Sequence, residues 1–354
     1  MKFFTDPRPS LSNWSTLHEY LSEDIPPPAM VSLDEYQAMS LSEQRQFDER
    51  RLRYVSSEMV ISTPPLEELI ETVGRVMEQN VAAAAGRRGV IVTGPATAGK
   101  TTACVATLRT AFVRFGRAHP ELLQAGAVPV AFINVPSSST PKSVMQSFAD
   151  FYSIPYVERD SHNSLKRAVV RAMRESLTQV AVVDEVQNLE RVSRNNGQSV
   201  DMLKDLSNES PTTFIYSGIN LEQSGLLAGA RGEQVARRFT PIRMSLAPGP
   251  GQWARIVKGF WNSLPLFAQN PEGPTKDEIK WLRDRSGAHM GTLASIIGQS
   301  VNMLINAGEP AAETLSIESM EAARLDLRAE QLVRLRSQQE TSRSVNKSRK
   351  PKVA

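Results

Sequence analysis

The sequence predicts an α/β fold, in which helices cover both faces of a parallel β-sheet and a helical lid follows. Short apolar runs alternate with helical patterns between residues 89 and 246. Runs rich in Val, Ile, Ala and Phe without polar alternation are typical of strands buried on both faces, with the helices as crossovers. After residue 250 the strand patterns stop and helical patterns follow. We expect strands at 89–93, 128–135, 180–184, 213–217 and 242–246, and lid helices at 253–262, 276–286, 292–307 and 317–338.

The regions on either side of the α/β domain are predicted to be less regular. Residues 1–62 form an accessory segment, partly disordered, in which Pro26-Pro27-Pro28 interrupts the chain and residues 41–54 make a polar helix. A helix is expected to begin at Pro64 and lead into the core. The predicted domains are therefore 1–62, an α/β domain at 63–247, a helical lid at 248–330 and a basic, disordered tail at 331–354.

The composition favours a soluble cytoplasmic protein. Cys104 is the single cysteine of the 354 residues, so no internal disulfide can form, and there is no Cys/His cluster with metal-ligand spacing. No apolar stretch approaches the ~18 residues of a membrane span. The net charge of +3 gives little support for a nucleic-acid partner, although residues 343–352 carry five basic side chains and no acid. This tail is either simply solvated or contacts DNA phosphates.

A phosphate-binding loop follows the first predicted strand. Gly94-Pro95-Ala96-Thr97-Ala98-Gly99-Lys100-Thr101, followed by Thr102, matches the pattern G-x-x-x-x-G-K-[ST] between a strand and a helix. The glycines let the backbone curl so that N–H groups face phosphate oxygens, and Lys100 reaches the β- and γ-phosphates. The Thr101 hydroxyl would bind Mg²⁺. The alternative is an ordinary glycine-rich turn. The pattern predicts binding of ATP with Mg²⁺ in a P-loop NTPase fold.

Two acids end the third predicted strand, as in a Walker B element. Asp184 would hold Mg²⁺ through a water, and Glu185 would polarise the water that attacks the γ-phosphate. A strand that simply ends in solvated acids is the alternative. Their place downstream of a P-loop favours Mg²⁺-dependent ATP hydrolysis.

Polar residues near the last two strands are further candidates for the catalytic site. Ser217 and Asn220 follow the fourth strand and are either sensors of the nucleotide or turn formers. Arg237 and Arg238 precede the fifth strand, where an arginine could complete the active site of a neighbouring subunit. One of the two could instead be a structural ion-pair partner.

The order of these motifs resembles that of AAA+ ATPases, and finer features resemble the TniB transposition proteins, relatives of TnsC and more distantly of MuB. The resemblance covers roughly residues 60–325, and its finer features lie at 202–209, 264–266 and 286–291. It implies an ATPase that assembles as a homo-oligomer on double-stranded DNA, selects target sites and recruits or activates a transposase. Hydrolysis would release it. Such a protein is cytoplasmic, and associated with the nucleoid when bound to DNA.

The chain departs from the TniB-like pattern at two places. Gln187 stands where these proteins usually carry His, and residues 288–297 contain no Arg that could act as a second sensor. Thr292 or His289 would be poor substitutes for a fixed positive charge.

The sequence says less about how DNA would be bound. Residues 137–142 could meet a phosphate, or Thr140 could simply cap a helix. Arg191, Arg194 and residues 195–197 form a second basic loop, which could equally be solvated. Without interleaved aromatic and basic residues, we expect contacts to the DNA backbone with little sequence readout. Rival functions are a helicase loader or initiator-like ATPase, and a nucleotide-gated signalling ATPase that binds no DNA.

Overall fold

The computed structural model describes residues 10–23, 25–57, 60–137, 139–189, 196–222, 232–233, 236–245, 248–327 and 329–331, and of residues 196–200 it describes the backbone alone. The chain forms two compact units, each built from two stretches of sequence. The first unit combines Met1–Asp24 with Thr63–Ser245, and the second combines Ile25–Ser62 with Leu246–Ala354. We call them the α/β unit and the helical unit.

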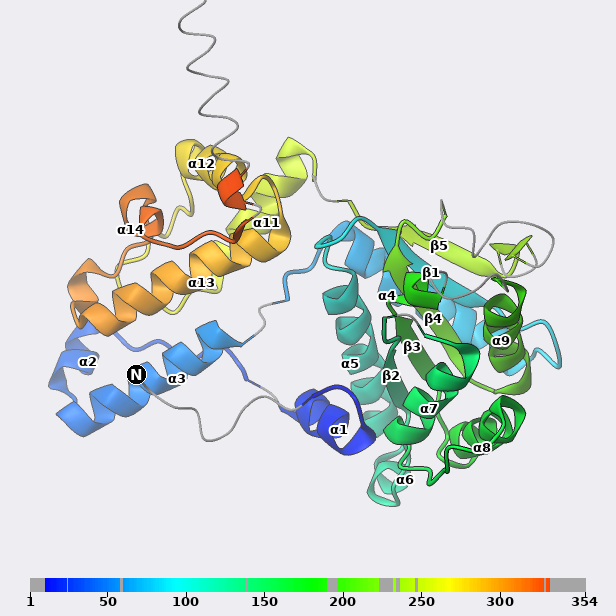
Figure 1. Cartoon of the computed structure of the whole chain (residues 1–354). Helices are drawn as coiled ribbons and strands as arrows, with labels where there is room; N and C mark the ends of the chain where they lie inside the picture. Colours follow the sequence, from blue (N-terminus) through cyan, green and yellow to red (C-terminus); the bar gives the residue numbers. More distant parts are fainter. Residues whose placement is uncertain are drawn as a thin grey trace, which may run out of the picture. The chain divides into compact units, whose positions relative to one another are not determined.

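The α/β unit is built on a five-stranded parallel sheet with the order β2-β3-β4-β1-β5. The three central strands are buried almost throughout, because helices lie on both sides of the sheet (Figure 1). One side has α5 (Lys100–Ala118), and the other has α8 (His162–Glu175) and α9 (Asn196–Glu209). This confirms the predicted fold class. The strands are β1 (Gly89–Gly94), β2 (Val130–Asn134), β3 (Val180–Asp184), β4 (Thr213–Ile219) and β5 (Phe239–Arg243).

The fifth strand lies three residues earlier than the predicted range of 242–246. β5 pairs with β1 from Phe239 onward, and the Phe239 ring stacks on Tyr216 with centroids 4.8 Å apart. Of its five residues, Phe239 and Ile242 are buried and the other three are exposed. β5 is an edge strand, so it tolerates Pro241 and lacks the continuous apolar run by which the inner strands were predicted.

The helices of the α/β unit surround the sheet. α5 packs against β1, β2, β3 and β4, while α7, α8 and α9 pack on one another. The N-terminal helix α1 belongs to this unit. Arg109 of α5 donates to the carbonyls of Tyr20 (2.8 Å) and Glu23 (3.1 Å) at the end of α1. The elements are α1 (Trp14–Ser22), α4 (Pro64–Val81), α5 (Lys100–Ala118), α6 (Pro120–Gln124), α7 (Pro141–Phe151), α8 (His162–Glu175), η1 (Val186–Leu189) and α9 (Asn196–Glu209).

The helical unit contains a hydrophobic core built mainly from α11 and α13. Its elements are α2 (Leu33–Ala38), α3 (Leu41–Ser56), α11 (Pro250–Asn262), α12 (Lys276–Ser286), α13 (Met290–Ala307), η3 (Pro310–Ala312) and α14 (Ile317–Glu321). Residues 1–62, expected as one accessory segment, are thus divided between the two units. Within the described residues, no helix is both long and apolar enough to cross a membrane.

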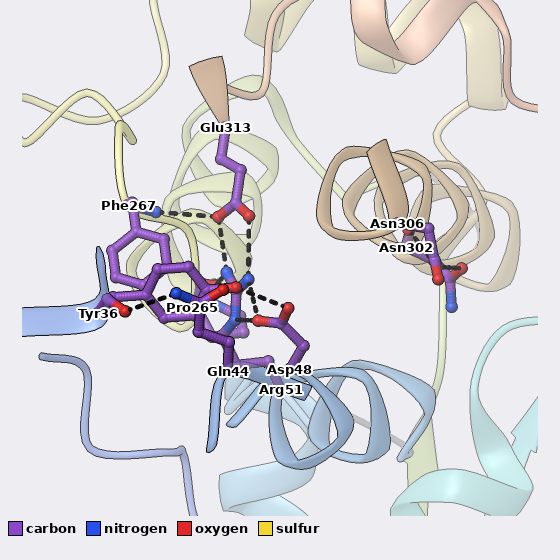
Figure 2. A network of polar contacts seen from close by, with 9 residues as sticks. All are labelled: Tyr36, Gln44, Asp48, Arg51, Pro265, Phe267, Asn302, Asn306 and Glu313. Carbon is purple, nitrogen blue, oxygen red and sulfur yellow. Dashed lines mark hydrogen bonds and ion pairs between the residues drawn. The ribbon is translucent and has the colours of Figure 1, made fainter. Parts of the chain in front are cut away.

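A buried charge cluster explains why α3 belongs to the helical unit. Arg51 is fully buried and makes five hydrogen bonds: to Asp48 (2.7 and 3.2 Å), Glu313 (2.6 and 2.9 Å) and the Pro265 carbonyl (3.0 Å). Figure 2 shows Arg51 between these partners and beside Phe267, whose ring centroid lies 4.8 Å from the guanidinium carbon. All five N–H groups of the guanidinium therefore have acceptors.

The last predicted lid helix, 317–338, is much shorter in the structure. α14 ends at Glu321, and Arg324 then exchanges two hydrogen bonds with the side chain of Gln299. Asp326 accepts from Ala329 N at 2.9 Å, which is how a capping residue begins a new helical turn. The prediction missed this break because Arg324 and Asp326 fit a helical pattern equally well. Residues 332–354, with the basic tail, lie outside the described residues.

Candidate nucleotide-binding site

The predicted phosphate-binding loop connects β1 directly to α5. Gly99 (φ 82°) and Thr97 (φ 63°) both adopt left-handed conformations, so the chain turns sharply before α5 begins. At Gly94, an added Cβ would lie 2.3 Å from the Met244 carbonyl oxygen, which leaves room for glycine alone. The first N–H groups of a helix have no partner within it, so the start of α5 provides donors for an anion.

Lys100 is held at the base of this loop. Its side chain is 6% exposed, and Nζ donates to the Pro95 carbonyl at 2.7 Å. Burial lowers the pKa of Lys100, while the nearby carboxylates of Asp184 and Glu185 act in the opposite direction. The ammonium group is thus partly desolvated beside the loop, where its interaction with phosphate would be strengthened.

Thr101 and Asp184 lie together although 83 residues separate them. The Thr101 hydroxyl donates to Asp184 Oδ2 at 2.6 Å, and Asp184 is 2% exposed at the end of β3. A hydroxyl and a carboxylate offer the hard oxygen ligands that Mg²⁺ prefers. Among the described residues, no three His, Cys, Asp or Glu side chains form a metal-binding group. The pair therefore fits a magnesium ion that takes its other ligands from phosphates and water.

Glu185 follows Asp184 in a left-handed conformation (φ 59°). Its backbone N–H donates to Asp184 Oδ1 at 2.9 Å, and its carboxylate accepts from Gln187 Nε2 at 2.5 Å. The sequence pattern predicts no role in the site for Gln187, which stands where TniB-like proteins usually carry His. A second polar side chain two residues after the acid was the signal that could have identified it.

The structure separates the two sensor candidates. Ser217 is fully buried within β4, paired in register with Val92. Asn220 is exposed beyond the end of β4, and its backbone N–H donates to the Gly94 carbonyl at 3.2 Å. Asn220 therefore lies at the start of the loop, whereas Ser217 lies in the sheet.

The phosphate-binding loop follows the C-terminal end of β1, whereas the two candidate arginines lie at the opposite end of the strands. β5 runs parallel to β1, with Phe239 opposite Gly89 and Arg243 opposite Thr93. Arg237 and Arg238 therefore precede β5 at the end of the sheet where β1 begins, and β1 itself spans about 16 Å from Gly89 to Gly94 at roughly 3.3 Å per residue. Neither can be brought to the loop of its own chain by this topology.

Their contacts differ. Arg238 Nη1 donates to Asn208 Oδ1 at 2.9 Å within the same unit. The Arg237 side chain is 82% exposed, and its Nη2 atom lies 3.7 Å from the Glu233 carboxylate, which is itself exposed. An exposed pair of this kind contributes little to stability. Arg238 thus has the contacts of a structural residue, and Arg237 those of a residue available to a partner.

Within residues 137–142, which were candidates for DNA contact, Thr140 and Lys142 make hydrogen bonds inside the chain. Thr140 caps α7 through Ser143 N (3.2 Å), and Lys142 Nζ donates to the Glu158 carbonyl. Ser138 lies outside the described residues, as do Arg191, Arg194 and Asn195, while Asn196 and Gly197 begin α9. DNA contact by either loop stays a prediction.

The solved structures with a similar fold include two proteins of Aeropyrum pernix. The Aeropyrum pernix ORC2 protein, in ADPNP-ADP complexes, superposes with a TM-score of 0.54 at 13% identity, over 76% of this chain and 70% of that chain. The Aeropyrum pernix ORC1 protein in complex with DNA gives a TM-score of 0.52 at 14% identity, over 77% of this chain and 66% of that chain. At this identity the likeness shows the shared AAA+ fold.

The sequence comparisons identify the family. None of the curated proteins matches this chain. The family model described as Bacterial TniB protein matches residues 51–247, which is more than half of the chain and includes the whole loop, Asp184, Glu185 and both arginines. The resemblance noted in the sequence is confirmed: the chain belongs to the TniB family of AAA+ ATPases.

Proposed function

We propose that this protein is a Mg²⁺-dependent ATPase that assembles on double-stranded DNA and selects target sites or activates a partner transposase. The contact between Thr101 and Asp184 carries the ATPase part of the proposal. It brings the loop and the acidic end of β3 together, so that a hydroxyl and a carboxylate oxygen lie side by side. Membership of the TniB family supports the role in transposition.

Residues of one chain would supply the groups that bind the nucleotide and activate water. The backbone of residues 94–99 and the start of α5 would bind the phosphates, with Lys100 against the β- and γ-phosphates. Thr101 and Asp184 would hold Mg²⁺, which would offset the negative charge of the phosphates. Glu185 would accept a proton from the attacking water. Asn220, whose backbone N–H bonds to the Gly94 carbonyl, would contact the nucleotide at the rim of the loop.

Replacing Lys100 by alanine is expected to abolish nucleotide binding. The substitution removes the buried ammonium group beside the loop and with it the main charge opposed to the phosphates. Titration calorimetry with ATP and Mg²⁺ measures this. Lys142→Ala is the matched control, because Lys142 lies outside the loop and should leave the ATP affinity unchanged. Normal affinity in the Lys100 variant would contradict the assignment.

Arg237 would complete the active site of a neighbouring subunit, which is why we propose a homo-oligomer. An arginine supplied in this way can contribute 10³–10⁵-fold to hydrolysis in related chemistry. The Arg237 side chain is exposed and lies at the end of the strands away from its own loop. It could therefore reach a nucleotide bound to a neighbouring subunit but not one bound to its own loop.

Arg237→Ala is therefore expected to bind ATP normally and to hydrolyse it slowly. Mixing it with the Lys100→Ala variant should restore part of the activity, because an intact Arg237 then faces an intact loop at some interfaces. Turnover at several mixing ratios measures this. Arg238→Ala, which loses its hydrogen bond to Asn208, should mainly lower the melting temperature. No recovery at any ratio would argue against the role in trans.

The DNA-binding part of the proposal rests on the family and on one structural relative. The Aeropyrum pernix ORC1 protein was solved in complex with DNA, and the shared fold also supports the second candidate, an initiator-like or helicase-loading ATPase. The two are distinguished by the partner: stimulation of a transposase favours the first and loading of a helicase the second.

The decisive experiment is ATP hydrolysis and sedimentation with and without duplex DNA. We expect duplex DNA to stimulate turnover, and a slowly hydrolysed ATP analogue to retain the protein on DNA in a complex visible by electron microscopy. Backbone-dominated binding should weaken steeply with salt and show little dependence on sequence. Hydrolysis that is indifferent to DNA, with no ATP-dependent pelleting, would favour the signalling ATPase.

A further inference from the structure

Gln187 makes two hydrogen bonds that connect separate parts of the nucleotide site. Its Nε2 atom donates to Glu185 Oε2 at 2.5 Å, and its Oε1 atom accepts from the backbone N–H of Ile219 at 2.9 Å. Glu185 follows β3, while Ile219 ends β4. One side-chain amide therefore joins the proposed base to the end of the neighbouring strand.

The orientation of this amide is fixed by chemistry. The backbone N–H of Ile219 can only donate, so the atom facing it must be the oxygen of the Gln187 amide. The nitrogen then faces Glu185, whose ionised carboxylate can only accept. A flipped amide would place a donor against a donor and an acceptor against an acceptor, so the two contacts enforce each other.

The structure leaves space for this bridge at Gly218. A Cβ built on Gly218 would lie 2.4 Å from Gln187 Oε1, so a side chain there would displace the amide. Gly218 is not among the residues with positive φ, so its backbone conformation does not itself require glycine. Close approach of the Gln187 amide is thus a reason for glycine at this position.

We propose that Gln187 is a positioning residue for Glu185, and that its amide couples the orientation of this carboxylate to the end of β4. The inference rests on the proposed function, since it assumes that Glu185 accepts the proton from the attacking water. Asn220, the sensor candidate beside Gly94, directly follows Ile219. A shift of the β4 end when nucleotide binds would therefore reach the base through one side chain.

Two variants separate the halves of the bridge. Gln187→Glu keeps an oxygen for the Ile219 N–H but removes the donor to Glu185 and places a second carboxylate beside it. Gln187→His can, as a neutral ring, donate from one nitrogen and accept at the other. Once protonated, the ring has two donors and no acceptor, so it loses the Ile219 half of the bridge.

We expect Gln187→Glu to lower kcat by about 10-fold or more while the ATP affinity stays near that of the unmodified protein, because misplacing a catalytic group slows the chemical step. Gln187→His should retain most of its turnover near pH 8. Its kcat should fall as the pH drops through the histidine pKa, about 6.5 in model peptides and higher beside a carboxylate. The pH profile of kcat for the unmodified protein should not show this fall.

The measurements are kcat, KM for ATP and the pH profile, with the melting temperature of each variant. Asn188→Ala is the control: Asn188 lies on the same turn and donates to the Val135 carbonyl at 2.8 Å, so its loss should lower stability without adding a titration. Unchanged kcat in Gln187→Glu, or a pH profile of Gln187→His that matches the unmodified protein, overturns the inference. Failure of the unmodified protein to hydrolyse ATP instead overturns the proposed function.

Discussion

Replacing Glu185 by glutamine is expected to lower ATP turnover by about 10²–10⁴-fold, the usual contribution of a general base, and to leave ATP binding intact. The amide has nearly the same shape as the carboxylate but cannot accept the proton of the attacking water. The groups that bind phosphate and metal, Lys100, Thr101 and Asp184, are unchanged. If ATP binding drives assembly on DNA, the variant should also stay on duplex DNA for longer.

Single-turnover hydrolysis and ATP titration measure the two effects separately. Glu175→Gln is the matched control, because Glu175 is an exposed carboxylate at the end of α8 and its replacement should leave turnover unchanged. Turnover in Glu185→Gln equal to that of the control would move the catalytic role to another residue. Loss of ATP binding would instead show that Glu185 supports the nucleotide or its metal.

The parts of the fold that the sequence predicted well are those with a local signal. The inner strands are buried on both faces, so their side chains are apolar without interruption, and the range predicted for the third strand, 180–184, is that of β3. The loop before α5 was recognisable because its glycines and Lys100 must lie within eight residues. The end of β3 was recognisable because its two acids are adjacent.

The parts that were missed depend on contacts between distant residues. α3 is a polar helix, and nothing within it distinguishes Arg51 from the exposed arginines on either side. Its burial depends on Glu313, 262 residues away. The role of Gln187 likewise depends on the Ile219 backbone, which any residue type would provide. β5 was misplaced by three residues because an edge strand needs only one buried face.

Arg51→Met is expected to destabilise the helical unit by about 3–5 kcal/mol, the usual effect of removing one partner of a buried ion pair. Methionine keeps most of the apolar stem, so the loss is mainly electrostatic. It leaves the Glu313 carboxylate, 2% exposed, with no positive charge from Arg51, and leaves the Pro265 carbonyl without its donor. The contacts of α3 with α13 should weaken with it.

Urea denaturation followed by tryptophan fluorescence reports on this unit, because Trp253, Trp261 and Trp281 lie in it and Trp14 alone of the four tryptophans lies in the α/β unit. Arg45→Met, at an exposed position of the same helix, should change the free energy of unfolding by no more than about 0.5 kcal/mol. The double variant Arg51→Met/Glu313→Gln should be less destabilised than the sum of the two single variants, because no unpaired charge remains buried. If Arg51→Met costs no more than Arg45→Met, the charge cluster does not hold α3 in the helical unit, and the apolar contacts of Tyr54 and Val55 must do so.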